Sequence, residues 1–262
     1  MLPNLYIPEL KIIGPVTVKP FGVLVALSIL IGYWLAIQRA KRTGLDMQIF
    51  ADCLFWALAG GFLGAHLFWA FFYNPQMIKD NPLVLLKIWE GISSFGGFFG
   101  GSLGVYVFFR RKKVDVIRYF EAIAFGFVPA WAIARLGCTI VFDHPGRPTD
   151  FILGMADGTG IVRHNLGFYE MLWTVVIVSV LYGLRNYRPF EGFQIVLVFF
   201  MYAPVRIFLD SLRVDDRTWG GFTPGQYFSA LLLALGVWLT IRGLKKSRGQ
   251  GTGNREKQEA DG

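Results

Sequence analysis

The chain alternates long apolar runs with short polar connections that are often basic. A helix needs roughly 20 apolar residues to cross the hydrocarbon layer of a bilayer, and this sequence supplies such runs repeatedly. We therefore expect an all-α integral membrane protein with about seven transmembrane helices. The expected spans cover residues 20–38, 50–72, 92–109, 119–142, 168–184, 190–209 and 224–241.

Two connections are too long to be simple turns. Residues 73–91 form an expected arm, in which the amphipathic stretch 83–89 is suited to the membrane interface. Residues 143–166 form a polar cap that contains Gly, Asp and Pro. We expect residues 1–244 to form one membrane domain and the polar, basic residues 245–262 to be a disordered tail.

The basic residues predict the orientation, because Lys and Arg are enriched on the cytoplasmic side of spans. Most of the 26 Lys and Arg follow the first, third, fifth and seventh spans. This places the N-terminus outside and the C-terminus in the cytoplasm, with the arm and the cap outside. The residues that set this orientation are Arg39, Lys41, Arg42, Arg110, Arg111, Lys112, Lys113, Arg118, Arg185, Arg188, Arg242, Lys245, Lys246, Arg248, Arg255 and Lys257.

Composition agrees with a membrane protein, with 54% hydrophobic and only 17% charged residues. The net charge of +8 comes from clusters beside apolar runs, so we expect no nucleic-acid partner. Cys53 and Cys138 belong to no CxxC motif, and the three histidines lack the spacing of metal ligands. We therefore expect no metal and no cofactor.

Several ionisable residues fall within the predicted spans, where each costs roughly 2.5–3.5 kcal/mol to insert. Given the expected orientation, all of them lie in the outer half of the membrane, next to the histidines of the cap. A site at the outer leaflet would have this arrangement. The span residues are His66, Arg135, Arg206 and Asp210, and those in or beside the cap are His144, Arg163 and His164.

Two arginines are candidates for binding an anion. Arg206, Asp210 and Arg213 share one helix face if the helix extends that far, so that the carboxylate bridges both guanidinium groups. This set is either an ion cluster at a helix end or a phosphate clamp, since guanidinium groups match phosphate geometry. Arg135 needs an anionic partner, which is either Asp143 or a lipid phosphate.

Glycines and histidines each allow two interpretations. Gly96, Gly97, Gly100, Gly101 and Gly104 have spacings that suit close helix packing, but they would also let a headgroup approach backbone N–H groups. Gly60 and Gly64 indicate packing alone. His66 is either structural or catalytic, whereas His144 and His164 lie in loops, where functional residues are commoner.

An ordered set of motifs resembles the bacterial prolipoprotein diacylglyceryl transferases. Ala134-Arg135-Leu136-Gly137 is similar to the family's Gly-Arg-Leu-Gly-Asn, and Asp143 to Arg147 is similar to its Glu-x-x-Gly-Arg. The other segments that carry the resemblance are Ile13-Gly14-Pro15-Val16, Trp89-Glu90-Gly91 before the glycine-rich span, His164 to Glu170, Arg206 to Arg213, and Gly221 to Ser229.

The resemblance implies transfer of the diacylglyceryl group of phosphatidylglycerol to the lipobox cysteine of a prolipoprotein signal peptide. Glycerol 1-phosphate is the other product, and the enzyme would lie in the bacterial inner membrane with its site toward the periplasm. Arg135 and Arg206 would bind the headgroup and Asp210 would orient Arg206. Gly96, Gly97 and Gly146 would shape a pocket, and the implied site also includes Arg213, Asp143, Tyr169 and Glu170.

The chain departs from the family pattern at several of these positions. Phe95 stands where the family has a histidine that is a proposed thiol-activating group, and it cannot accept a proton. Cys138 replaces Asn and Asp143 replaces Glu. The other departures are Phe21 for Tyr, His66 for Arg, and Gly167 where a Gln is lost.

Two explanations of these departures follow. The first is a working transferase whose base has moved to His66, His144 or His164. The second is a paralogue on the same scaffold that binds lipid without catalysis or has a different specificity. A small-solute transporter would need polar groups near the membrane midplane, whereas the ionisable groups here are displaced outward.

Overall fold

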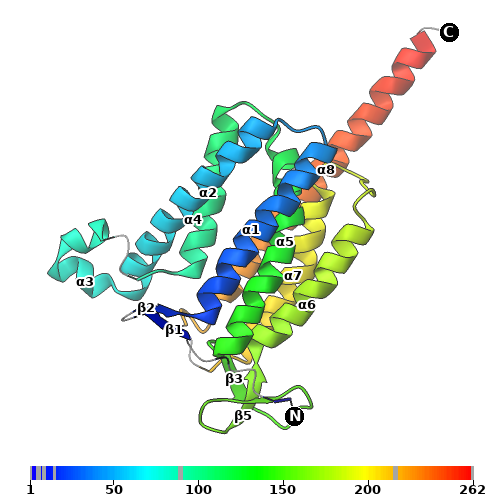
Figure 1. Ribbon diagram of the computed structural model, residues 1–262. Coiled ribbons are helices and arrows are strands. Elements are labelled where there is room, and N and C mark those ends of the chain that lie inside the picture. The colour runs from blue at the N-terminus through cyan, green and yellow to red at the C-terminus, as the bar shows by residue number, and fades with distance from the viewer. Residues whose placement is uncertain are drawn as a thin grey trace. The chain divides into compact units, whose positions relative to one another are not determined.

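The computed structural model describes residues 2, 3, 7, 10–13, 16–87, 91–214 and 218–260, with side chains described from 18 to 248 within those ranges and at 2, 3 and 7. The chain divides into two compact units (Figure 1). One unit comprises Met1–Arg39 with Phe120–Gly262, and the other comprises Ala40–Tyr119. Of the segments quoted for the family resemblance, Gly14, Pro15, Trp89 and Glu90 lie outside the described residues.

Long helices dominate both units and lie close to the expected spans. Their bounds are α1 Pro20–Arg42, α2 Met47–Phe68, α4 Ser94–Arg111, α5 Val116–Val141, α6 Leu166–Gly183, α7 Phe193–Ser211 and α8 Pro224–Ala260. Six of them are long and apolar enough to cross a membrane by length and composition, and α4 is the exception. Gly, Ser and two terminal arginines lower the hydropathy of α4. The prediction of an all-α integral membrane protein is confirmed.

The first unit packs α5 against α6 through apolar side chains. Phe125 and Val128 of α5 form a buried cluster with Ile177 and Leu181 of α6. Pro129 has no N–H, so it cannot bond to the Phe125 carbonyl one turn back. The Tyr182 hydroxyl of α6 donates to that carbonyl at 2.8 Å, which satisfies a backbone acceptor that lipid could not satisfy.

Large apolar side chains also point outward from this unit. Leu30 and Trp34 of α1 and Trp238 of α8 are each more than half exposed. Such exposure would be costly in water when it extends along whole helices. It is the expected surface of a helix that contacts lipid.

The cap contains a small antiparallel sheet that the sequence did not predict. Strands β3 Pro145–Pro148, β4 Met155–Ala156 and β5 Val162–Asn165 pair in the order β3-β5-β4 at one end of α5 and α6 (Figure 1). A further hairpin joins β1 Leu10–Ile13 to β2 Val16–Val18. These strands have two to four residues, too few to show an alternating pattern.

Glycines bring α2 and α4 together in the second unit. A Cβ built at Gly64 or Gly96 would lie closer than 3.0 Å to backbone atoms of the facing helix, a separation that real Cβ atoms essentially never show. Gly60 and Gly100 face each other in the same way. The structure therefore gives these glycines the packing role, as small residues have in membrane helix pairs.

The arm of the second unit is helical and is held to α2 by a histidine. It contains α3 Pro75–Asp80 and a short 3₁₀ helix, Pro82–Leu86, after a π-helical turn at Trp69–Tyr73. His66 Nε2 lies 3.0 Å from the Val84 carbonyl oxygen and its Nδ1 lies 3.4 Å from that of Gly91. The side chain of His66 thus bridges α2 and the arm.

Two helix ends differ from the sequence-based expectation. Helix α7 ends at Ser211, so Arg213 does not continue the helical face of Arg206 and Asp210. Instead, Arg213 pairs with Gly146 in an isolated antiparallel bridge. Helix α8 continues to Ala260, where we expected a disordered tail from 245. The segment mixes good helix formers such as Lys, Arg, Glu and Gln with three glycines.

The glycine packing predicts a contrast between two neighbouring positions of α2. Gly64→Ala should destabilise the protein by about 1–3 kcal/mol or more, because the added methyl group overlaps backbone atoms of α4. Gly61→Ala should be neutral or stabilising, since its Cβ would make an ordinary 3.5 Å contact. Thermal unfolding of both variants in detergent checks this, and equal unfolding temperatures would contradict the packing.

Candidate functional site

A buried carboxylate lies at the centre of the polar residues in the first unit. Glu170 of α6 is 1% exposed. Its Oε1 lies 3.1 Å from Arg135 Nε, and its Oε2 accepts a hydrogen bond from Arg206 Nη1 at 2.5 Å. Tyr202 and Trp131 donate to Oε1 at 2.5 and 3.1 Å. One carboxylate therefore joins two arginines from α5 and α7.

Asp210 holds the opposite side of Arg206. Its Oδ1 lies 2.9 Å from Arg206 Nη2, one helical turn away on α7. The Thr223 hydroxyl donates to Asp210 Oδ2 at 2.7 Å. At Gly225, in the first turn of α8, any Cβ would overlap Asp210 Oδ2. The absence of a side chain there is what allows α8 to begin against the ion pair.

Arg135 keeps part of its guanidinium group free of acidic partners. Its guanidinium carbon Cζ lies 4.2 Å from the centre of the Trp131 ring, and its Nη1 lies 3.5 Å from Cys138 Sγ. Among the described residues, Nη2 of Arg135 makes no hydrogen bond, and the contact of its Nε with Glu170 is an ion pair without hydrogen-bond geometry. Arg135 is thus positioned by Glu170 through Nε, while a terminal nitrogen remains available for another acceptor.

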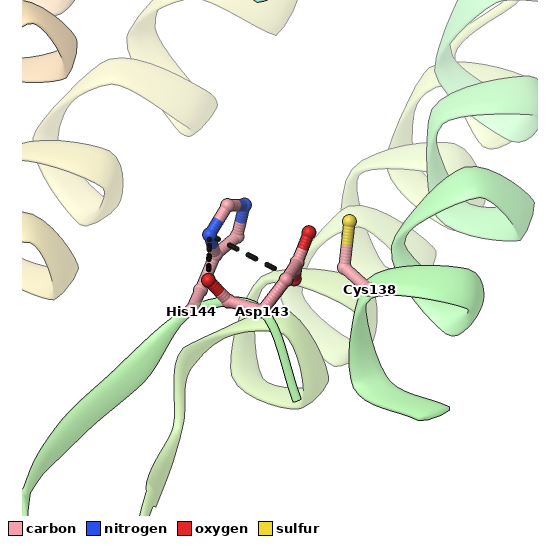
Figure 2. Close-up of side chains that lie close together, drawn as sticks. All are labelled: Cys138, Asp143 and His144. Atoms are coloured by element: carbon pink, nitrogen blue, oxygen red, sulfur yellow. Dashed lines mark hydrogen bonds and ion pairs between the residues drawn. The ribbon is translucent and has the colours of Figure 1, made fainter. Parts of the chain in front are cut away.

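The residues that follow α5 form a second group next to these arginines. Figure 2 shows the Asp143 carboxylate between the His144 ring and the Cys138 thiol. His144 Nδ1 lies 2.9 Å from the Asp143 carbonyl oxygen, 3.7 Å from Asp143 Oδ1 and 3.3 Å from Arg213 Nη2. Arg213, although it lies outside α7, therefore joins the site through His144.

Three guanidinium groups act on the imidazole of His144. The pKa of His144 is lowered to about 3, mainly by burial. The positive charges of Arg135, Arg213 and Arg206 also lower it, with effects that decrease in that order. These groups outweigh the opposite effect of Glu170. Several guanidinium groups near one point can bind a phosphate, because they match its geometry.

The same geometry argues against a cation. The possible ligand atoms of Cys138, Asp143 and His144 lie within 4.8 Å of one another, although the sequence indicated no metal site. Arg135 contacts the sulfur and Arg213 contacts the imidazole. A metal ion would face two guanidinium groups at close range, so we assign no metal to these residues.

The remaining cap residues form a separate contact network. His164 Nδ1 lies 3.0 Å from the Tyr169 hydroxyl, which donates to the Leu153 carbonyl at 3.3 Å. Burial lowers the pKa of His164, and no charged group contributes to the shift. Gly146 packs against His164 and carries the bridge to Arg213. These residues support the cap on which His144 lies.

Three predicted site residues belong to the other unit. His66 of α2 and Gly96 of α4 make the contacts already described for the arm and the helix pair. A Cβ at Gly97 of α4 would make only ordinary contacts with α2, the nearest at 3.6 Å. The geometry thus brings together Arg135, Arg206, Asp210 and Glu170, with Arg213, Asp143 and His144 beside them.

Comparisons with known proteins identify the family of the chain. The family model described as prolipoprotein diacylglyceryl transferase matches residues 8–242. The chain belongs to the prolipoprotein diacylglyceryl transferase family. A phosphatidylglycerol–prolipoprotein diacylglyceryl transferase of Allorhizobium ampelinum is 31% identical over 91% of this chain and 90% of its own. A protein of the same name from Listeria innocua is 28% identical over 87% of this chain and 87% of its own. Another, from Synechococcus elongatus, is 28% identical over 92% of this chain and 89% of its own.

The sequence did not predict three residues of the site in this member of the prolipoprotein diacylglyceryl transferase family. Trp131 precedes Arg135 by one helical turn, and Tyr202 precedes Arg206 by one turn. Their spacing of four residues was a usable signal, because such residues share a helix face. Thr223 lies in the segment Gly221 to Ser229 that carries the resemblance, but it reaches Asp210 from outside any predicted span, so its contact could not be predicted.

The shared carboxylate makes Glu170→Gln a test of the network. The change keeps the shape but removes the charge that pairs both arginines, so it should destabilise this member of the prolipoprotein diacylglyceryl transferase family by about 3–5 kcal/mol. Thermal unfolding measures it. The control Glu191→Gln removes a more exposed ion pair with Lys246 and should cost less than about 1 kcal/mol. Equal effects would contradict a central role for Glu170.

Proposed function

We propose that the protein transfers the diacylglyceryl group of phosphatidylglycerol to the lipobox cysteine thiol in the signal peptide of prolipoproteins. Glycerol 1-phosphate is the second product. The family membership and the names of the relatives support this reaction. They give no support to a lipid-binding paralogue without catalysis.

The observation that carries the proposal is the pair of buried guanidinium groups joined by Glu170. Transfer to a thiol breaks a bond between carbon and a phosphate oxygen, so negative charge develops on the leaving phosphate. Donors that are already fixed around this position stabilise that charge without reorganisation. Glu170, Asp210, Tyr202 and Trp131 fix the donors in this way.

The distribution of charge along the chain supports a placement of the site in the membrane. The protein is a multi-pass membrane protein, and the family implies the bacterial inner membrane. We place the cap and the arginine cluster toward the periplasm, with the N-terminus outside and the C-terminus in the cytoplasm. The support is the concentration of Lys and Arg after alternate spans.

The proposed reaction can be tested directly. Purified protein incubated with phosphatidylglycerol and a lipobox peptide should add one diacylglyceryl group to the cysteine, as measured by mass spectrometry. Arg135→Lys and Arg206→Lys should each lower the rate by about 100-fold or more, because lysine keeps the charge but loses the guanidinium fork.

Wild-type protein that leaves the peptide unmodified, at good expression and with intact folding, would overturn the proposed reaction. A near-normal rate in either lysine variant would remove that arginine from the phosphate site. Failure to complement a conditional diacylglyceryl transferase mutant would count against the activity in the cell.

A further prediction concerns orientation. Gly158→Cys lies in the cap before α6, and Asn186→Cys lies in the exposed connection after it. If α6 crosses the membrane once, a maleimide that cannot cross membranes should label the cap position in spheroplasts and leave the other unlabelled until lysis. The native Cys53 and Cys138 are buried, so background labelling should be low. The reverse labelling pattern would invert the topology.

A further inference from the structure

Transfer to a thiol requires a group that removes its proton. A free cysteine has a pKa near 8.5, so about nine-tenths or more of it is protonated at neutral pH. The two central carboxylates are poorly suited to take the proton. Glu170 accepts from Arg206, Tyr202 and Trp131, and Asp210 is held by Arg206 and Thr223. Protonating either one would leave a buried guanidinium group without its counterion.

The imidazole of His144 is a basic group beside these arginines that does not serve as the counterion of an arginine. Two acceptors lie near its Nδ1, namely the Asp143 carbonyl oxygen at 2.9 Å and Asp143 Oδ1 at 3.7 Å. Arg213 Nη2, which can only donate, lies 3.3 Å from the same Nδ1. The carbonyl oxygen is the closer group, and it favours the tautomer in which Nδ1 carries the proton. The other ring nitrogen points away from the Asp143 backbone (Figure 2), and among the described residues it makes no hydrogen bond. Nε2 therefore has a free lone pair.

We propose that His144 accepts the proton of the attacking thiol through Nε2, and that Asp143 positions its ring. This inference rests on the proposed transfer reaction and assigns one of its steps. The S–H bond breaks and its proton moves to Nε2, while sulfur forms a bond to the glycerol carbon of the diacylglyceryl group. The bond from that carbon to the phosphate oxygen breaks, and its electron pair leaves on the phosphate. The proton on His144 then passes to the departing glycerol phosphate or to water.

The surrounding charges couple this step to lipid binding. In the lipid-free protein, burial and the guanidinium groups of Arg135, Arg213 and Arg206 keep His144 neutral, against the effect of Glu170. Asp143 and Cys138 are the other titratable groups close to the imidazole, with side-chain atoms within 4.8 Å of it. A phosphodiester that binds to these guanidinium groups supplies the negative charge that an imidazolium needs. His144 thus becomes an effective base when the lipid is in place.

The other histidines fit this role less well. His164 contacts Tyr169 and aromatic residues of the cap, and the arginines do not contribute to its pKa shift. A bound phosphate would therefore change its proton affinity little. Both ring nitrogens of His66 lie against backbone carbonyls of the arm. His144 is the histidine that shares a contact with an arginine of the cluster.

The test compares cysteine and selenocysteine forms of one lipobox peptide, because a selenol is ionised at neutral pH and needs no base. His144→Gln should lower kcat for the cysteine peptide by about 100-fold or more, with little change in the KM for phosphatidylglycerol. With the selenocysteine peptide the variant should come within about tenfold of wild type. Its rate with cysteine should also rise about tenfold per pH unit up to about pH 8.5, following the thiolate fraction.

The outcomes separate this inference from the proposed function. Wild-type protein that modifies neither peptide would refute the transfer reaction. If wild type is active, an equal loss with both peptides would show that His144 is structural. Normal turnover by His144→Gln, or selenocysteine rescue of His164→Gln in its place, would assign the proton to another group.

Discussion

A single buried carboxylate determines how the cationic groups of this protein are arranged. Glu170 lies between Arg135 and Arg206 and contacts both. Two guanidinium groups brought together in a membrane protein would repel each other strongly at low dielectric. The shared carboxylate removes that repulsion and fixes their separation, while Tyr202 and Trp131 fix the carboxylate itself. The anion binding that we propose for the site depends on this arrangement.

The rest of the first unit holds these groups in place. The apolar contact of α5 with α6 fixes Arg135 relative to Glu170, and α7 supplies Arg206 and Asp210 one turn apart. The start of α8 closes against Asp210 through Gly225 and Thr223. The cap then brings His144 to Arg213 through the bridge between Gly146 and Arg213. Elements that are distant in the sequence thus contribute one or two side chains each.

The sequence predicted the helices well because their signal is local. Apolar runs of the right length identify spans, and α1, α5 and α6 begin and end within a few residues of the expected bounds. Arg135 and Arg206 were found because a charge within an apolar run is costly and therefore conspicuous. The pairing of both arginines with Glu170 could not be predicted, since Glu170 lies on a third helix and its partners depend on tertiary packing. The position of Arg213 was missed because the end of α7 at Ser211 depends on contacts with the cap.

The most direct test of this account is an experimental structure of the protein in a bilayer mimetic with phosphatidylglycerol bound. We expect phosphate oxygens within hydrogen-bonding distance of Arg135 and Arg206, with Glu170 still between the two guanidinium groups. A phosphate bound elsewhere, with both arginines enclosed by protein acceptors and no path from them to lipid, would contradict the account.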